Sequence, residues 1–270
     1  MVVRVERKES VVTIINDRPE ARNAGDPKTA TDLTRAFREF EADKTAKVAV
    51  FYGEGGYFCS GWDLKYAATL SDPEKFREEI VEGLAFGNGE KAVPRGPLGP
   101  SRLNLSKPVI GAIEGPAVAG GMELALWCDI RVMAETAYFG VYCRRWGIPL
   151  LDGGTVRLPR LVGTGRALEI ILTGRKVPAE EALRIGLCEK VVGHGQARSA
   201  AEELARTIAG FPQAAVKADR RNVYETYGLS IGNAMRTEWK NGVNAHLEEG
   251  AAGAKRFSAG SGRHGSFESI

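Results

Sequence analysis

The sequence predicts an α/β fold, and three observations lead to that prediction. Apolar runs of strand length occupy residues 48–52 and 109–113. Each run is followed by a turn rich in small residues and then by a pattern with helical spacing. From about residue 200 onward, the pattern is helical throughout. Strands that alternate with helices are typical of an α/β core, to which a helical C-terminal segment would be joined.

From the N-terminus, the predicted elements begin with two strands and a helix, and they end with three helices. Residues 2–5 and 11–16 have the pattern of two neighbouring strands. Asp26 and Pro27 then open a helix that runs to about Ala42, since proline is favoured at the first helical position. After the strand at 109–113, a helix begins near Gly120. The last helices are expected at 201–209, 213–227 and about 231–248, and the glycine-rich residues 250–270 are expected to form a solvated polar tail.

Composition restricts the classes of function. The 270 residues, of which 43% are hydrophobic, can supply one sizeable core. There are 37 Lys and Arg against 34 Asp and Glu, a net charge of only +3 without a dense basic run, so no nucleic-acid partner is expected. The four cysteines lie far apart and the three histidines are scattered, so we expect neither a disulfide framework nor a metal site.

The N-terminal residues alternate like a strand and lack the apolar stretch of a signal peptide. No run of residues approaches the length of a transmembrane helix. We therefore expect a cytoplasmic protein that has no membrane partner.

The most informative stretch lies at the start of the helix near residue 120, where Gly120 and Gly121 precede Glu123. The first amides of a helix have no partner within it, and the positive end of its dipole lies there, so the segment is suited to bind a negative oxygen. The alternative is that the glycines only permit close backbone packing.

A second turn of this kind follows the strand at 48–52. It contains the run Gly55-Gly56-Tyr57-Phe58-Cys59-Ser60-Gly61-Trp62-Asp63-Leu64-Lys65. Two such turns are able to present two backbone N–H groups to one carbonyl oxygen. This arrangement stabilises an oxyanion or an enolate.

At these residues the chain resembles the crotonase family, which comprises the enoyl-CoA hydratases, isomerases and their relatives. The family patterns Phe-x-[Ala/Ser]-Gly-x-Asp-Leu and Gly-Gly-x-x-Glu-Leu match at Phe58 to Leu64 and Gly120 to Leu124. Residues 16–24, 128–131, 172–174, 179–182 and 186–187 extend the resemblance.

The resemblance implies a spiral of β-β-α units. Residues 1–195 would form the core with the CoA and oxyanion site, and residues 196–270 a helical trimerisation segment and tail. It also implies a homotrimer or hexamer that acts on an acyl-CoA thioester, with coenzyme A as part of the substrate and no separate cofactor.

The same resemblance implies roles for the residues of the two turns. The oxyanion donors would be the N–H groups of Trp62 and Gly120. The CoA-binding residues would be Arg22, Ser60, Asp63, Leu64 and Lys65, although a charge such as Arg22 or Lys65 taken alone is more often only solvated. The segment 83–100, rich in Gly and Pro, is either a lid over the site or a plain surface connection.

The acid–base residues depart from a standard hydratase, which uses two glutamates. The first is Glu123, whose alternative role is to complement the dipole of its own helix. Counting from Phe139 and Gly140 places Cys143 at the second. A thiol has an ordinary pKa of about 8.5 against about 4.3 for glutamate, so it replaces a carboxylic acid poorly. Cys143 is either a thiolate stabilised by the arginines that follow it or a packed, unreactive cysteine.

Asp152 offers a replacement carboxylate. Some isomerases of the family carry a catalytic Glu just before the corresponding Gly-Gly, and dihydroxynaphthoyl-CoA synthases carry an Asp there. The alternative is that Asp152 caps the helix that follows it. The two roles do not exclude each other.

These residues predict an enoyl-CoA hydratase/isomerase-type enzyme that acts through an oxyanion-stabilised enolate. Glu123, with Asp152 or Cys143, would handle the protons. The alternatives are another CoA chemistry of the family, such as decarboxylation, hydrolysis or ring closure, and a catalytically weak acyl-CoA-binding scaffold.

Overall fold

A six-stranded sheet forms the centre of the computed structural model, which describes residues 2–86, 93–262, 264 and 267. The strands lie in the order β1 (Val3–Lys8), β2 (Val11–Asn16), β3 (Val48–Gly53), β4 (Val109–Ile113), β6 (Ile130–Ala134) and β9 (Lys190–Val192). β1 is antiparallel to β2, and the remaining neighbours are parallel. Parallel strands end at the same edge of a sheet, so the turns that follow β3 and β4 meet.

A smaller sheet lies at that edge and connects the two turns. It consists of β5 (Ala117–Val118), β7 (Tyr138–Gly140) and β8 (Lys176–Pro178), in that order. β5 is parallel to β7, and β7 is antiparallel to β8. Cys59 in the first turn forms a parallel bridge with Ala117 of β5, which ties the two predicted site motifs together.

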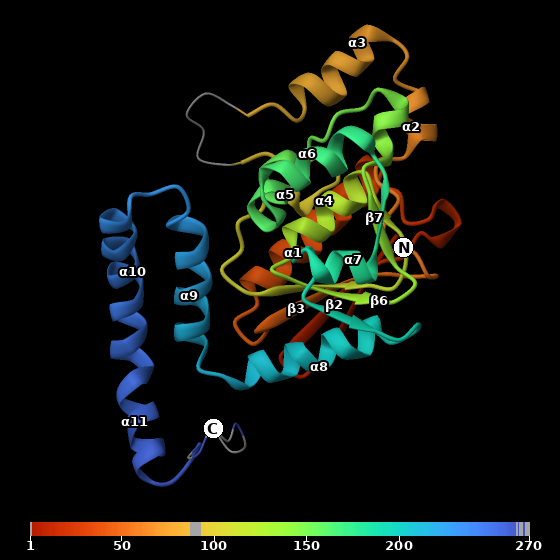
Figure 1. Cartoon of the computed structure of the whole chain (residues 1–270). Helices are drawn as coiled ribbons and strands as arrows, with labels where there is room; N and C mark the ends of the chain where they lie inside the picture. Colours follow the sequence, from red (N-terminus) through yellow and green to blue (C-terminus); the bar gives the residue numbers. More distant parts are fainter. Residues whose placement is uncertain (1, 87–92, 263, 265–266, 268–270) are drawn as a thin grey trace.

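Helices cover both faces of the large sheet. α8 (Ala197–Gly210) lies under one face, where its buried alanines pack against valine and isoleucine side chains of the strands. α1 (Pro27–Ala42) and α4 (Gly120–Trp127) lie on the other face (Figure 1). Phe37 of α1 meets Phe51 and Trp127 edge to face, at ring-centroid separations of 5.4 and 4.8 Å.

The expected elements of the first half are confirmed. α1 begins at Pro27, as predicted, because the Asp26 side chain accepts a 2.7 Å hydrogen bond from the amide of Thr29. The strands at 11–16 and 109–113 match the predicted bounds, and α4 begins at Gly120. The first strand runs further than expected, to Lys8, because it pairs with β2 along its whole length.

Several short helices surround the core, and the sequence pattern indicated only one of them, the helix after Asp152. They are α2 (Leu64–Ala68), α3 (Pro73–Phe76), α5 (Gly154–Val162), α6 (Thr164–Thr173) and α7 (Ala179–Arg184). Short 3-10 turns occur at Pro19–Ala21, Pro100–Arg102 and Tyr142–Trp146, and a π-helical turn continues α3 at Arg77–Glu82.

The C-terminal helices project to one side of the core (Figure 1). They are α9 (Gln213–Glu225), α10 (Ile231–Ala245), a π-helical turn at His246–Gly250 and α11 (Ala251–Ser258). The tail expected from residue 250 is helical up to Ser258, and nearly all residues of α11 are exposed, as expected of a solvated segment. The alanines of this stretch favour helix strongly enough to continue α10 despite the glycines. Arg263 lies outside the described residues.

Within the described part of the chain, no helix combines the length and the apolar character that crossing a membrane requires.

Candidate active site

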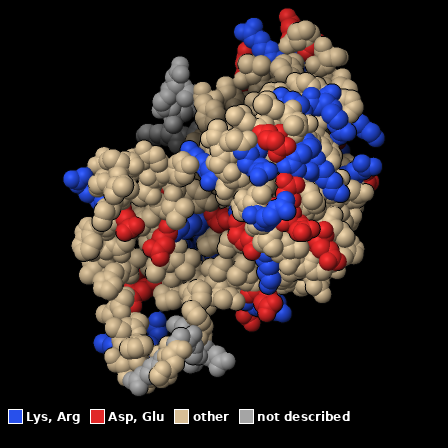
Figure 2. Space-filling model, in the orientation of Figure 1, with Lys and Arg blue, Asp and Glu red and all other residues tan. Residues whose placement is uncertain are grey.

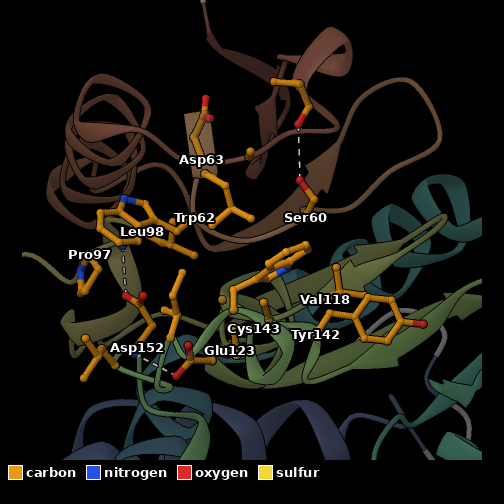
Figure 3. A pocket seen from close by; sticks show the side chains of 18 of the residues that line it. Ser60, Trp62, Asp63, Pro97, Leu98, Val118, Glu123, Tyr142, Cys143 and Asp152 are labelled. Carbon is orange, nitrogen blue, oxygen red and sulfur yellow. Dashed lines mark hydrogen bonds between the residues drawn. The ribbon is translucent and has the colours of Figure 1, made fainter. Parts of the chain in front are cut away.

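One pocket of about 870 Å³ brings the predicted site residues together (Figure 3). Its volume lies in the range of small-molecule sites. All ten residues to which the sequence gave a site role line it: Arg22, Ser60, Trp62, Asp63, Leu64, Lys65, Gly120, Glu123, Cys143 and Asp152. Residues that the sequence did not indicate line it too, among them Arg18, Arg95, Leu98 and Tyr142.

The two glycine-bearing turns lie against each other in this pocket. The amide of Val118 donates to the carbonyl of Cys59 at 3.0 Å, which aligns the turn after β3 with β5. At Gly61 an added Cβ would lie 3.0 Å from the amide nitrogen of Gly120. The backbone on either side of Trp62 is therefore adjacent to the first amide of α4.

Neither of the two predicted donors is used inside the described part of the chain. Gly25 donates to the carbonyl of Gly61 at 2.8 Å and accepts from the amide of Asp63 at 2.9 Å. Because successive residues of an extended segment face opposite ways, the amide of Trp62 points away from Gly25. The amide of Gly120, at the first position of α4, has no partner within the helix. Both N–H groups thus remain available to a ligand.

Ala119, which has a strained backbone, sets the direction of the first turn of α4. Ala119 adopts φ 53° and ψ −126°, a conformation that residues with a Cβ rarely adopt, and its amide donates to the carbonyl of Gly140 at 2.8 Å. The next two positions require glycine for close contact. A Cβ at Gly120 would collide with the Leu98 side chain, and one at Gly121 would collide with the carbonyl of Cys59. The glycines therefore both permit close packing and leave the amide of Gly120 open to the pocket.

Glu123 lies deep in the pocket with only 3% of its surface exposed. Its Oε1 accepts hydrogen bonds from the amides of Gly154 at 2.7 Å and Asp152 at 2.9 Å, so it binds the N-terminus of α5. Burial first, and then the charge of Asp152, raise the pKa of Glu123 to about 7. Its Oε2 makes no hydrogen bond to any described residue. The carboxyl group is held by one oxygen and presents the other to the pocket.

Asp152 is buried beside Glu123, but it does not cap α5. The residue at the cap position is Gly153, which offers no side chain, so the expected capping role is wrong. Instead, Oδ1 of Asp152 accepts from the amide of Leu98 at 3.1 Å and from the Ser101 hydroxyl. Burial raises the pKa of Asp152, against the opposing effect of these hydrogen bonds. Asp152 therefore fastens the segment around Leu98 to the floor of the pocket.

Cys143 occupies the position at which a standard hydratase has its second glutamate. It lies in the 3-10 turn after β7, with 6% of its surface exposed. Burial raises the pKa of its thiol, and this outweighs the opposing charge of Arg144. The burial of Cys143 favours the packed, unreactive interpretation, because the shift has the opposite direction from that of a reactive cysteine.

The predicted CoA-binding residues lie on the outer part of the pocket. The Asp63 carboxylate accepts from the amides of Lys65 and Tyr66 and pairs with Arg18 at 2.8 Å, so it caps α2. Figure 3 shows it directed away from Glu123. Ser60 donates to the carbonyl of Ala21 at 3.3 Å. Arg22, Leu64 and Lys65 are exposed at the rim.

The segment 83–100 was expected to be either a lid or a surface connection. Its described C-terminal part forms the pocket wall, since Arg95, Pro97 and Leu98 line the cavity and Leu98 is bonded to Asp152. Gly87 and Gly89 lie outside the described residues.

Comparison with known proteins identifies the family. The sequence model described as enoyl-CoA hydratase/isomerase matches residues 6–93 and 97–249. The chain belongs to this family. It is 35% identical over 254 residues to the enoyl-CoA hydratase EchA19 of Mycobacterium tuberculosis, with 92% of this chain and 89% of the relative covered. It is 38% identical over 224 residues to the carnitinyl-CoA dehydratase of Proteus mirabilis, with 82% and 80% covered.

Solved structures of the enoyl-CoA hydratase/isomerase family share the fold over nearly the whole chain. The enoyl-CoA hydratase EchA1 of Mycobacterium marinum superposes with a TM-score of 0.84 at 30% identity, covering 96% of both chains. An enoyl-CoA hydratase of Bacillus anthracis gives a TM-score of 0.83 at 28% identity with the same coverage. The predicted crotonase fold and membership of an enzyme family are therefore confirmed.

Proposed function

We propose that the chain is an enoyl-CoA hydratase or isomerase in which Glu123 is the principal proton carrier. One observation carries the proposal. A buried carboxyl group whose pKa is raised to about 7 lies in the same pocket as two backbone N–H groups that have no partner among the described residues. A pKa near the working pH lets one group both accept and donate a proton.

The amides of Trp62 and Gly120 supply the electrostatic part of the mechanism. They bind the thioester oxygen, whose negative charge grows as an enolate forms. Because the donors are fixed by the backbone, they need little rearrangement during the reaction. Loss of one such donor typically raises the barrier by about 2.7–4 kcal/mol. The N-terminal end of the α4 dipole acts in the same direction.

Cys143 stands where a standard hydratase has its second glutamate, and this determines which chemistry is expected of Glu123. A single carboxylate can take a proton from one carbon of a bound acyl chain and return it to another, which moves a double bond. It can also exchange a proton with water during hydration or dehydration. Cys143 is a poor second acid, and Oδ1 of Asp152 is already used by Leu98 and Ser101. The pocket therefore favours one-carboxylate chemistry over the two-glutamate route.

Coenzyme A would enter as part of the substrate. The exposed cations Arg22 and Lys65 lie at the rim, and Arg145 stacks on Tyr142 with its guanidinium carbon 4.5 Å from the ring centroid. These groups are placed to attract phosphates while the thioester reaches inward.

The proposal is tested with Glu123→Gln and a pair of substrates, 2-enoyl-CoA and 3-enoyl-CoA. The amide keeps the hydrogen-bond acceptor for Gly154 but cannot carry the proton. We expect wild-type protein to change the absorbance of the conjugated thioester with at least one substrate. The variant should lose roughly 100-fold or more of that rate while its affinity for a saturated acyl-CoA changes little.

The matched control is Cys143→Ser, which alters the same pocket wall without removing a carboxylate. It should retain turnover with the wild-type pH dependence. Undiminished turnover in Glu123→Gln would remove Glu123 from the mechanism. Binding of acyl-CoA without turnover of either substrate by the wild type would favour the scaffold alternative.

We also propose that the chain assembles as a homotrimer, the state implied by the family resemblance. Ile231, Met235 and Trp239 follow one another at intervals of four residues on α10 and are 80%, 66% and 73% exposed. A stripe of large apolar side chains open to water is typical of an association surface. In Figure 2 the surface around α9 and α10 is mostly uncharged, whereas charged side chains of both signs gather over the core.

A further inference from the structure

Arg95 belongs to the pocket wall, in the segment that packs on the proposed reaction site. It is half-buried and lines the cavity. Directly after it, Gly96 and Gly99 exchange two backbone hydrogen bonds of 2.9 Å, which form a tight turn. The turn is fixed by the bond from Leu98 to Asp152. Arg95 is therefore held by a rigid segment.

The guanidinium group of Arg95 forms no ion pair with a described residue. Its Nη1 donates to the carbonyls of Gly96 at 3.0 Å and Pro97 at 3.3 Å, and no carboxylate of a described residue forms an ion pair with it. By contrast, Arg18 in the same pocket pairs with Asp63 and Asp26. Burial lowers the pKa of Arg95, because a cation withdrawn from water without a partner is destabilised.

The charged groups near Arg95 are engaged elsewhere. Glu79 bonds to the Tyr66 hydroxyl and lies 3.9 Å from the amine of Lys75. Arg102 donates to the carbonyl of Leu84 and stacks on Phe86. Asp152 attracts Arg95 electrostatically but forms no ion pair with it. The nitrogens Nε and Nη2 of Arg95 have no hydrogen-bond partner among the described residues.

Arg95 lies on a different segment from the predicted phosphate-binding residues and interacts electrostatically both with Asp152 and with Tyr66 of α2. Arg22, Ser60 and Lys65 lie at the rim, on the turn after β3 and the loop that precedes α1. The segment of Arg95 instead contacts the reacting end of the pocket, because Leu98 fills the space beside Gly120 and bonds to Asp152. A ligand group that reaches Arg95 would thus belong to the acyl part of the thioester, beyond the carbonyl held by Trp62 and Gly120.

We propose that Arg95 is a specificity-determining residue that binds a carboxylate carried by the acyl chain, so that the preferred substrates are CoA thioesters of dicarboxylic acids. The inference rests on the proposed function. A guanidinium fork binds a carboxylate through two parallel hydrogen bonds, and Nε and Nη2 form such a fork. Binding supplies the counter-charge that the half-buried cation lacks. An acyl chain that ends in a methyl group leaves it unpaired.

The experiment compares two 2-enoyl-CoA substrates of equal chain length, one ending in a methyl group and one in a carboxylate. We expect wild-type protein to favour the carboxylate in kcat/KM by roughly 10- to 100-fold, the range of a charged hydrogen bond. Arg95→Gln should lose most of this preference through a higher KM for the carboxylate substrate. It should leave the methyl-ended substrate and the pH profile nearly unchanged.

Two further variants separate the binding role from a structural one. Arg95→Lys keeps the charge but not the fork, and it should retain an intermediate preference. Arg38→Gln removes a cation of α1 that lines, together with Arg95, a second groove outside the pocket, and it should behave as wild type. Equal losses for both substrates in Arg95→Gln would overturn the proposal, as would a wild-type enzyme without preference for the carboxylate.

A binding measurement distinguishes failure of the proposed function from failure of the inference about Arg95. The saturated thioesters of the same two chains are titrated calorimetrically into wild-type protein and Arg95→Gln. If turnover is absent or survives Glu123→Gln, the proposed function fails. Tighter binding of the carboxylate-bearing thioester that depends on Arg95 would still support the inference about this residue. Equal binding of both would overturn it.

Discussion

At the scale of single residues, the surroundings of a carboxyl group determine its pKa and therefore its chemistry. Glu123 and Glu181 are both first-turn acids of their helices. Glu181 forms a hydrogen-bonded ion pair with Arg175, which lowers its pKa. Glu123 is buried next to another carboxyl group, and its pKa is raised to about 7. The same residue type in the first turn of a helix therefore acquires opposite pKa shifts, because burial and neighbouring charges differ.

The raised pKa of Glu123 predicts how stability varies with pH. Its ordinary pKa is 4.5, and in the folded protein it is about 7, so the folded state keeps a proton that the unfolded chain has lost. The free energy of unfolding should therefore fall as the pH rises from about 4.5 to about 7 and then level off. The contribution of this group amounts to about 3 kcal/mol at most.

Glu123→Gln removes this titration while keeping a hydrogen-bond acceptor. Relative to wild type, we expect the variant to gain stability at pH 8 and to gain little at pH 4. Urea unfolding at the two pH values measures the difference. An equal change at both pH values would show that folding does not shift the pKa of Glu123.

At the scale of elements, the start of α4 depends on contacts with two other segments. Gly121 lies against the carbonyl of Cys59, and Gly120 lies against Leu98. The start of α5 depends in turn on α4, because the Glu123 carboxylate accepts from the first amide of α5. The two helix ends and the turn after β3 thus form one packed unit. A change in any of them should disturb the whole site.

This packing predicts opposite effects of the same substitution at two glycines. Gly121→Ala places a methyl group against a backbone carbonyl that cannot turn aside, and we expect a loss of about 3 kcal/mol. Gly165→Ala, near the start of α6, meets open space and should gain about 0.5–1 kcal/mol, since alanine favours helix. Chemical denaturation of both variants measures the contrast. A stable, active Gly121→Ala protein would contradict the tight fit.

At the scale of the whole molecule, the core and the C-terminal helices differ in how completely they bury their apolar side chains. The large sheet is covered on both faces. α10 instead leaves large apolar side chains in water, and α10 and α11 project away from the core (Figure 1). α9 is joined to the core by the ion pair of Arg220 with Asp129 at 2.9 Å. The proposed trimer would bury these side chains against other copies of the chain.

The proposed assembly predicts that a charge on α10 separates the subunits. Trp239→Glu places a carboxylate in the apolar stripe, and we expect the trimer to dissociate in sedimentation velocity experiments. Lys240→Glu changes the charge at the next position of the same helix and should leave the trimer intact. A wild-type protein that sediments as a monomer would contradict the assembly. Equal dissociation of both variants would show that the added negative charge, and not the loss of Trp239 from the apolar stripe, separates the subunits.

The sequence determined the elements and motifs that depend on local properties. Proline placement and apolar periodicity set the bounds of α1 and β4. The two motifs predicted the family and the approach of Trp62 to Gly120. The presence of Cys143 in place of a glutamate was visible without coordinates. These features follow from residue type and spacing, which act over a few neighbouring residues.

The tertiary structure decided what depends on contacts between distant segments. Asp152 proved to hold Leu98 and Ser101 rather than to cap α5, and these partners lie about fifty residues away in the sequence. The strained φ of Ala119, the raised pKa of Glu123 and the unpaired cation of Arg95 have the same origin. Burial and counter-charges are properties of the packed molecule, so no local pattern specifies them.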